Sequence, residues 1–233
     1  MVKAGVCKTP IVGSIPTVAS KSRPEGLRRP RLSPTAKPMI DARARAVLDE
    51  LERHDARERE QGTPRAERLR QVTPEVGRFL HTLVLATRPR SIVEIGTSGG
   101  YSTVWLATAA RAVGAGVVTL EIDPVKVLRA TASLRGAGVD GVATIVEGDA
   151  FAYLSERREP IDFVFLDAEK EDYTAFLELI VPLLPPGGLL VADNLTSHAE
   201  DLAEFRRRAE SDPRLSAVVV PIGRGELIAA KIG

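Results

Sequence analysis

The chain has 233 residues, of which 44% are hydrophobic, and its 32 Lys and Arg side chains nearly balance its 31 Asp and Glu side chains. This length suits one large domain, and the composition is sufficient to build a hydrophobic core. The single cysteine, Cys7, excludes an intramolecular disulfide framework. No run approaches the ~18 apolar residues that span a bilayer, which excludes a membrane protein. The lone cysteine and the lack of a recognisable signal sequence favour a cytoplasmic location.

The first 38 residues differ in composition from the rest of the chain. They contain eight basic side chains, one acidic side chain and six prolines, whereas the other 195 residues carry 24 basic and 30 acidic side chains. Prolines at this density oppose helices and central strands, so residues 1–38 are expected to form a disordered basic arm. A secretory signal is not expected, because Pro16 interrupts the apolar run. The arm is compatible with a transit peptide, a nucleic-acid-binding segment or a dispensable tail before a true start at Met39.

Residues 39–72 are predicted to form an N-terminal helical segment ahead of the main domain. Residues 41–60 are charged and helix-forming, with a modest apolar stripe, and a Gly-Thr-Pro sequence ends them. Thr73 and Pro74 then match the N-cap and the first position of a second helix. The main domain is therefore expected to span residues 73–233.

Within the main domain, short apolar runs alternate with helical segments. The expected strands cover residues 91–94, 117–121, 143–147, 162–167 and 188–193. The expected helices cover residues 102–113, 124–137, 150–157, 173–184 and 201–210. This alternation predicts a doubly wound, Rossmann-like α/β fold, in which a mostly parallel sheet has helices on both faces. The last two runs, 216–222 and 226–232, are joined by a Gly-Arg-Gly turn and predict a C-terminal antiparallel hairpin at one sheet edge.

A glycine-rich loop, GTSGGYS at residues 96–102, follows the first expected strand. Glycines let a ligand approach the backbone closely, and the helix that starts here offers free N–H groups to a carboxylate or a phosphate. Ser102 is placed to donate to that anion. Glu94 lies inside the strand, where it either caps the loop or touches the ligand. The loop lacks G-x-G-x-x-G spacing, which argues against a nicotinamide oxidoreductase.

The next two strand ends extend this candidate site. Glu121 ends the second strand, the position at which doubly wound folds bind the two hydroxyls of a ribose. The alternative is a solvated carboxylate that binds nothing. Ala150 follows the third strand, where an adenine would lie.

Polar side chains also follow the fourth and fifth strands. Asp167 ends the fourth strand, and Asp193 and Asn194 end the fifth. Because the carboxyl ends of parallel strands meet at one edge of a sheet, these side chains are expected to converge. Two carboxylates and an amide suit Mg²⁺ better than Zn²⁺. The alternative is a set of independent helix caps.

Lys170 follows Asp167 by three residues. Near a bound cation an ammonium group loses its proton more readily, so Lys170 is a candidate general base. The alternative is a surface lysine that pairs with Glu171 or Asp172.

Together these segments resemble the class I S-adenosylmethionine-dependent, metal-dependent O-methyltransferases of the catechol and caffeoyl-CoA type, over about residues 73–233. The motifs that carry the resemblance are residues 94–96 with 100–102, 119–122, 165–173 and 192–194, the last two being the most specific. The resemblance implies S-adenosylmethionine and Mg²⁺, or another divalent cation, as cofactors. It implies Lys170 and Asp167 as catalytic residues, and Asp167, Asp193 and Asn194 as metal ligands. The cofactor-binding residues that it implies are Val72, Glu94, Gly96, Thr97, Ser102, Glu121, Ile122, Ala150, Asp167 and Glu169.

The expected function is methyl transfer to a hydroxyl of a small catechol-like or phenolic substrate. Ala168 and Glu169 stand where catechol enzymes of this family place His and Trp, which leaves the substrate open. One alternative is a tRNA hydroxyuridine methyltransferase, although the acidic, aromatic-poor domain argues against nucleic acid. Another is a cofactor-binding protein without catalysis. Family members often form homodimers, so residues 40–76 and the last hairpin are candidate interface elements.

Overall fold

The structure of the protein is a computed structural model that describes residues 40–64 and 68–233. The predicted disordered arm, residues 1–38, lies outside the described residues. Among the helices of the described part, none is long and apolar enough to cross a membrane.

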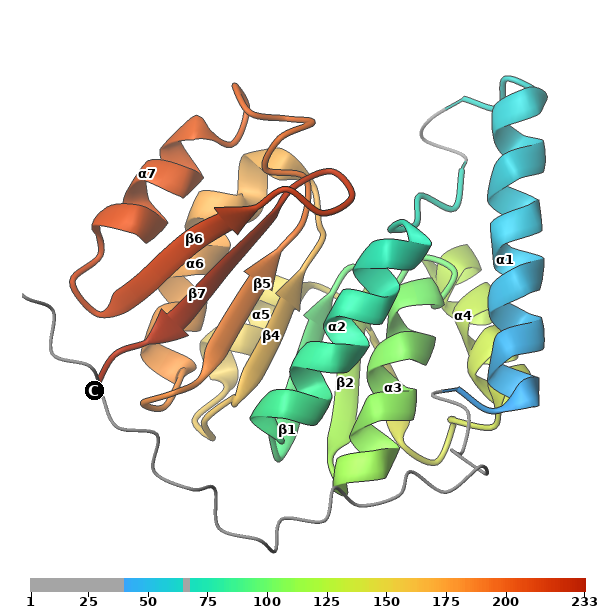
Figure 1. Cartoon of the computed structure of the whole chain (residues 1–233), viewed down its shortest axis with the longest axis horizontal. Coiled ribbons are helices and arrows are strands. Elements are labelled where there is room, and N and C mark those ends of the chain that lie inside the picture. The colour runs from blue at the N-terminus through green and yellow to red at the C-terminus, as the bar shows by residue number, and fades with distance from the viewer. Residues whose placement is uncertain (1–39, 65–67) are drawn as a thin grey trace, which may run out of the picture. The chain divides into compact units, whose positions relative to one another are not determined.

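A seven-stranded sheet organises the described residues, with the strand order β3-β2-β1-β4-β5-β7-β6. Its strands are β1 (Ser91–Ile95), β2 (Gly116–Glu121), β3 (Ala143–Glu147), β4 (Phe163–Leu166), β5 (Leu189–Ala192), β6 (Leu215–Val220) and β7 (Glu226–Lys231). The first five strands are parallel, and β7 lies antiparallel between β5 and β6 (Figure 1). The predicted doubly wound fold with an antiparallel hairpin at one edge is confirmed.

Helices cover both faces of this sheet. The helices are α1 (Ala42–Glu60), α2 (Pro74–Thr87), α3 (Tyr101–Val113), α4 (Pro124–Ala137), α5 (Ala150–Glu156), α6 (Tyr173–Leu183) and α7 (Ala203–Ser211), with a 3₁₀ turn at Lys170–Asp172. One hydrophobic core packs the helices α1, α2, α3 and α4 against one face of the sheet. A second hydrophobic core packs α5, α6 and α7 against the opposite face. In β4, Phe163 and Phe165 face the first core, whereas Val164 and Leu166 face the second, which explains why the strand is apolar throughout.

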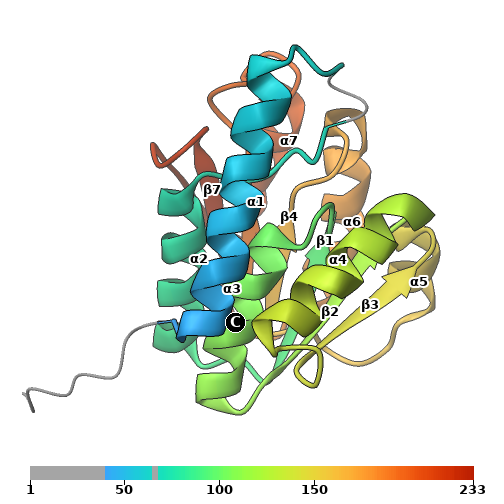
Figure 2. The ribbon, with the colours of Figure 1, turned by 90° about the vertical axis from the view of Figure 1, so that its right-hand side faces the viewer.

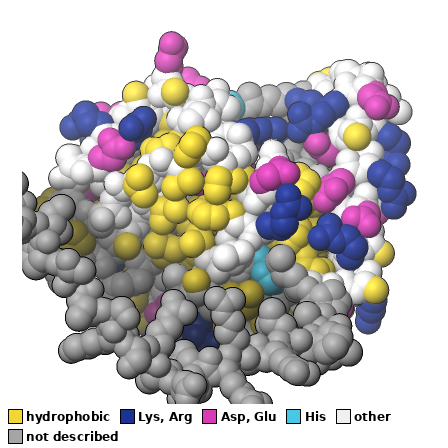
Figure 3. All heavy atoms as spheres, in the orientation of Figure 1, with side chains coloured by type: hydrophobic (Ala, Val, Ile, Leu, Met, Phe, Trp, Pro, Cys, Tyr) yellow, Lys and Arg dark blue, Asp and Glu magenta, His cyan; other side chains and the backbone are white. Residues whose placement is uncertain are grey.

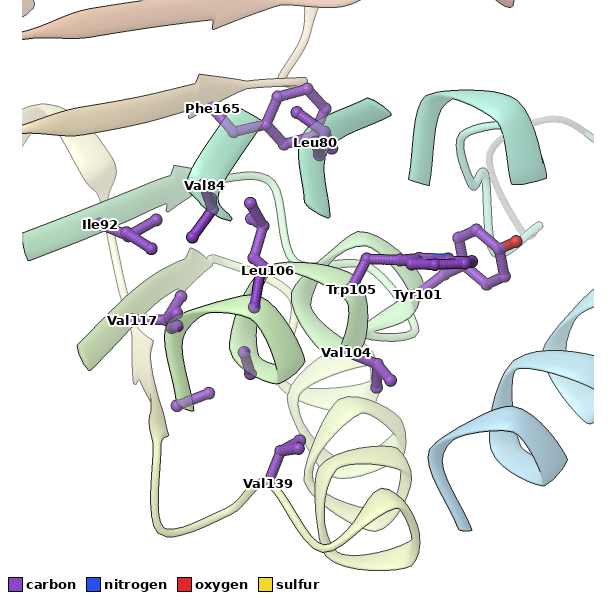
Figure 4. Close-up of a cluster of buried hydrophobic side chains, with 14 of the residues drawn as sticks. Leu80, Val84, Ile92, Tyr101, Val104, Trp105, Leu106, Val117, Val139 and Phe165 are labelled. Atoms are coloured by element: carbon purple, nitrogen blue, oxygen red, sulfur yellow. The ribbon is translucent and has the colours of Figure 1, made fainter. Parts of the chain in front are cut away.

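Local chemistry accounts for the start of α2 and for its packing. The Thr73 side chain accepts a hydrogen bond from the Val76 N–H, and Pro74 occupies the first turn, as predicted. Leu80 of α2 then packs in the core that Figure 4 shows, and α2 lies close against α3. Figure 2 shows α1 running beside α3 and α4, which it contacts.

The ends of β4 and β5 position the predicted site. Both strands stop one residue earlier than expected, so Asp167 and Asp193 lie just beyond them. The Asp167 N–H still donates to Ile95 O at 3.0 Å, and the Asp193 N–H to Leu166 O at 3.1 Å. These bonds hold both residues at the carboxyl edge of the sheet although the strands have ended.

Hydrophobic side chains gather over β6 and β7 on the face that Figure 3 shows. Val218 of β6 is 56% exposed. This hairpin is one of the elements that the sequence indicates as an interface between two copies of the chain, and that role stays a prediction.

Candidate active site

A cavity of about 440 Å³ opens at the carboxyl ends of the parallel strands. Its volume lies within the range of small-molecule sites. The predicted site residues that line it are Val72, Gly96, Thr97, Ser102, Glu121, Ile122, Ala150, Asp167, Glu169, Lys170 and Asn194. Two predicted residues, Glu94 and Asp193, do not line the cavity but lie buried beneath it.

The loop after β1 passes close to the end of β4. Gly96 has a φ of +100°, and a Cβ at this position would lie 2.2 Å from the Asp167 carbonyl oxygen, so only glycine fits. Gly100 begins α3 with a φ of +86° and supplies no side-chain cap. The first N–H groups of α3, near Ser102, are therefore available to an anion in the cavity.

Glu121 is anchored by backbone donors. Its carboxylate accepts hydrogen bonds from the N–H groups of Ser98 at 2.7 Å, Ile122 at 3.1 Å and Asp123 at 3.0 Å. Glu121 is only 8% exposed, so it is not the solvated strand-end carboxylate of the alternative interpretation. The neighbouring Ile122 is 71% exposed and presents an apolar surface at the cavity edge, which suits a flat base.

Glu94 supports the loop from below. It is fully buried and accepts hydrogen bonds from the hydroxyls of Thr103 at 2.5 Å and Thr119 at 2.6 Å. The Thr119 hydroxyl also lies 2.5 Å from the hydroxyl of Thr97, which lines the cavity. Burial raises the pKa of Glu94 to about 7. Glu94 therefore bonds to α3 and β2 beneath the cavity, and its place among the cofactor-binding residues stays a prediction.

Lys170 joins the fourth and fifth strand ends into one cluster. Its ammonium group donates to Asp167 Oδ1 at 3.0 Å, to Ala168 O at 2.8 Å and to the Tyr173 hydroxyl at 3.0 Å. The Asn194 side-chain amide donates to the same Asp167 oxygen at 3.0 Å. Lys170 is therefore not a surface lysine paired with a neighbouring acid, because its ion pair is with Asp167.

Beneath this cluster lie two more carboxyls, those of Asp193 and Glu226, and the sequence patterns did not indicate Glu226 as a site residue. Asp193 is 2% exposed and accepts a hydrogen bond from the Asn194 N–H at 2.6 Å. Burial and the nearby Asp167 carboxylate raise the pKa of Asp193 to about 6. Glu226, the first residue of β7, is fully buried, and burial together with Asp193 raises its pKa to about 11. The sequence signal that could have indicated Glu226 is an acidic residue at the start of an otherwise mostly apolar strand.

This carboxyl-rich edge fits a divalent cation in its donor chemistry. Crowded, buried carboxyls disfavour one another's charge, and a hard cation relieves that repulsion. The candidate ligands remain two carboxylates and an amide, Asp167, Asp193 and Asn194. Among residues 40–64 and 68–233, no group of three or more His, Cys, Asp or Glu side chains is arranged to hold a metal ion.

Four further residues of the cavity wall are not indicated by any pattern in the sequence. Phe151 of α5 stacks on Phe176 of α6 with ring centroids 4.1 Å apart, and both line the cavity. Arg70, which precedes α2, forms an ion pair with Glu169 at the cavity edge. Arg224, in the turn between β6 and β7, completes the wall near Asn194. These residues come from segments that are far apart in the sequence, so no local sequence pattern could indicate that they lie in one cavity.

Known proteins are similar to this chain in sequence. A family model described as a methyltransferase domain matches residues 93–195. A catechol O-methyltransferase of Niastella koreensis is 36% identical over 137 residues, which are 57% of this chain and 62% of that relative. A Mycobacterium sp. (strain JLS) protein described as an O-methyltransferase is 33% identical over 174 residues, 69% of this chain and 79% of its own.

The architecture is shared as well. The crystal structure of an O-methyltransferase from Bacillus cereus in complex with SAH has a TM-score of 0.68 and 29% identity, and the match covers 80% of this chain and 90% of that one. The sequence match spans less than two thirds of the Niastella koreensis relative but most of the mycobacterial one. On the strength of these matches, the chain belongs to the class I O-methyltransferase family.

Proposed function

We propose that this protein transfers the methyl group of S-adenosylmethionine to a hydroxyl of a small catechol-like or phenolic molecule, with the help of a divalent cation such as Mg²⁺. One observation carries the proposal: the hydrogen-bonded cluster of Lys170, Asp167 and Asn194 opens into the same cavity as Glu121. A methyl donor and a hydroxyl acceptor held in one cavity react largely through proximity and orientation. The catechol O-methyltransferase of Niastella koreensis supports the substrate class.

The proposed cofactor site follows from the donors and acceptors on the cavity wall. The uncapped start of α3 near Ser102 would hold the carboxylate of S-adenosylmethionine. Glu121 would accept hydrogen bonds from both ribose hydroxyls, since backbone N–H groups already fix its position. Ile122 and Ala150 would flank the adenine. The Bacillus cereus structure was solved in complex with SAH, which supports S-adenosylmethionine as the cofactor.

The other end of the cavity would deprotonate the acceptor hydroxyl. Asp167, Asp193 and Asn194 would hold the cation, and a bound divalent cation supplies positive charge that stabilises a deprotonated oxygen. Lys170, in its neutral form, would take the hydroxyl proton at Nζ. The three acceptors around Nζ then stabilise the resulting ammonium group.

A methyl-transfer assay with labelled S-adenosylmethionine and a panel of catechols tests the proposal. We expect labelled product with Mg²⁺, loss of product with EDTA, and recovery when Mg²⁺ is added back. Transfer that EDTA does not change would contradict the metal site and leave the cofactor site in place. Tight binding of S-adenosylhomocysteine without transfer to any catechol would contradict the substrate class.

A further inference from the structure

The turn that joins β6 to β7 lies at the same end of the sheet as the carboxyl ends of β4 and β5 (Figure 1). The loop that follows Asn194 holds its backbone. The Thr196 N–H and hydroxyl donate to Arg224 O at 2.9 and 2.5 Å, and the Leu195 N–H donates to Gly225 O at 2.8 Å. The Arg224 backbone is therefore fixed beside the proposed metal end of the cavity.

Close packing on both sides keeps this turn in place. Gly225 has a φ of +89°, and a Cβ there would lie 2.5 Å from Thr196 Cγ2. Gly223 has a φ of +58°, and a Cβ there would lie 2.4 Å from Val76 Cγ2 at the start of α2. The turn is wedged between α2 and the loop after β5, so the Arg224 side chain projects from a defined position.

Lys126 and Arg224 are the two cations of the cavity without an ion pair to a described residue, and Arg224 is the one held beside the proposed metal end. The cationic residues that line the cavity are Arg70, Lys126, Lys170 and Arg224. Lys170 pairs with Asp167, and Arg70 pairs with Glu169. Lys126 makes no ion pair with a described residue, but its charge helps to lower the pKa of Glu169. Arg224 as a residue is half-buried, and its guanidinium forms no ion pair or hydrogen bond with any residue among 40–64 and 68–233.

We infer that Arg224 binds a carboxylate of the substrate, so that the substrate class is a carboxylated catechol or phenol. The inference rests on the proposed function, in which the carboxylate of S-adenosylmethionine lies at the start of α3 and leaves Arg224 to another anion. The planar guanidinium matches a carboxylate through two parallel N–H···O bonds. Because Arg224 lines the same cavity as Asn194, the carboxylate would lie on the substrate side of this cavity, away from the start of α3.

Two substrates of nearly the same shape, one with a carboxylate and one with a neutral amide, test whether Arg224 binds the negative charge. The kcat/KM for methylation of 3,4-dihydroxybenzoate is compared with that for neutral 3,4-dihydroxybenzamide, with Mg²⁺ present. We expect the full chain to prefer the benzoate by about tenfold or more, mainly through a lower KM, because a hydrogen bond to a charged group contributes at least this much. Arg224→Gln should bring the ratio close to one, and Arg224→Lys should keep part of the preference.

The ratio is the readout because it cancels any general loss of activity in a variant. Arg207→Gln serves as the matched control, since Arg207 lies on the exposed surface of α7 and pairs with Glu204, and it should leave the ratio unchanged. A ratio near one in the unmodified protein, or an unchanged ratio in Arg224→Gln, would overturn the inference and leave the proposed function standing. Failure of the unmodified protein to methylate either compound or any other catechol would overturn both.

Discussion

The two ends of the cavity achieve their polarity in different ways. At the proposed cofactor end, around Glu121, three backbone N–H groups hold the Glu121 carboxylate, and the protein itself satisfies the charge. At the proposed catalytic end, around Lys170, burial and the nearby Asp167 carboxylate raise the pKa of Asp193, and Glu226 adds a further buried carboxyl. The comparison indicates that the first end is complete once the chain folds, whereas the second holds charge repulsion that a cation would relieve.

Lys170→Met should have the largest effect, and this effect should fall on catalysis and not on cofactor binding. The substitution keeps the length of the side chain and removes the proton acceptor, so kcat should fall about a thousandfold, within the range for loss of a general base. The affinity for S-adenosylhomocysteine, measured by titration calorimetry, should change less than threefold. Lys126→Met, a second lysine of the same cavity, is the control and should lower kcat only slightly. Comparable losses in both variants would remove the distinction between the two ends.

Glu121→Gln should have the opposite pattern and a smaller effect. The neutral amide keeps the shape but weakens the bonds from the backbone N–H groups and to the ribose, so S-adenosylhomocysteine should bind roughly a hundredfold more weakly. Glu147→Gln is the matched control, because Glu147 pairs in register with Glu121 on the neighbouring strand and is exposed. Calorimetry on both variants checks the expectation, and equal affinities would mean that Glu121 does not hold the cofactor.

The same contrast explains what the sequence could predict. Glu121, Asp167 and Asn194 each lie at or just beyond the carboxyl end of a strand, and a parallel sheet brings these ends to one edge whatever the strand order. Local patterns were therefore enough to place these residues around one cavity. The helix start at Thr73 and Pro74 was similarly local.

Residues of the last hairpin could not be placed in this way. Glu226 and Arg224 reach the catalytic end only because β7 inserts antiparallel between β5 and β6. A hairpin at the edge of the sheet is predictable from the turn, but the strand that pairs with β5 is not, since either strand of the hairpin presents an apolar surface. Glu94 posed a different difficulty, because the tertiary packing around Thr103 and Thr119 decides its burial.

The smallest expected effect is on stability, and it concerns the buried Glu94 beneath the proposed cofactor end. Its pKa is raised from 4.5 to about 7 by burial, so the folded protein keeps a proton that the unfolded chain releases between these values. The free energy of unfolding should therefore fall as the pH rises through this window, by roughly 2 kcal/mol between pH 5 and pH 8.

Glu94→Gln cannot release a proton, and its stability relative to the unmodified protein should improve by that amount over the same range. Urea unfolding at both pH values measures the difference, and Glu147→Gln, which replaces an exposed carboxylate, should show no such trend. A parallel pH dependence in the unmodified protein and in Glu94→Gln would mean that Glu94 is ionised in the folded state and that its two threonine donors outweigh the cost of its burial.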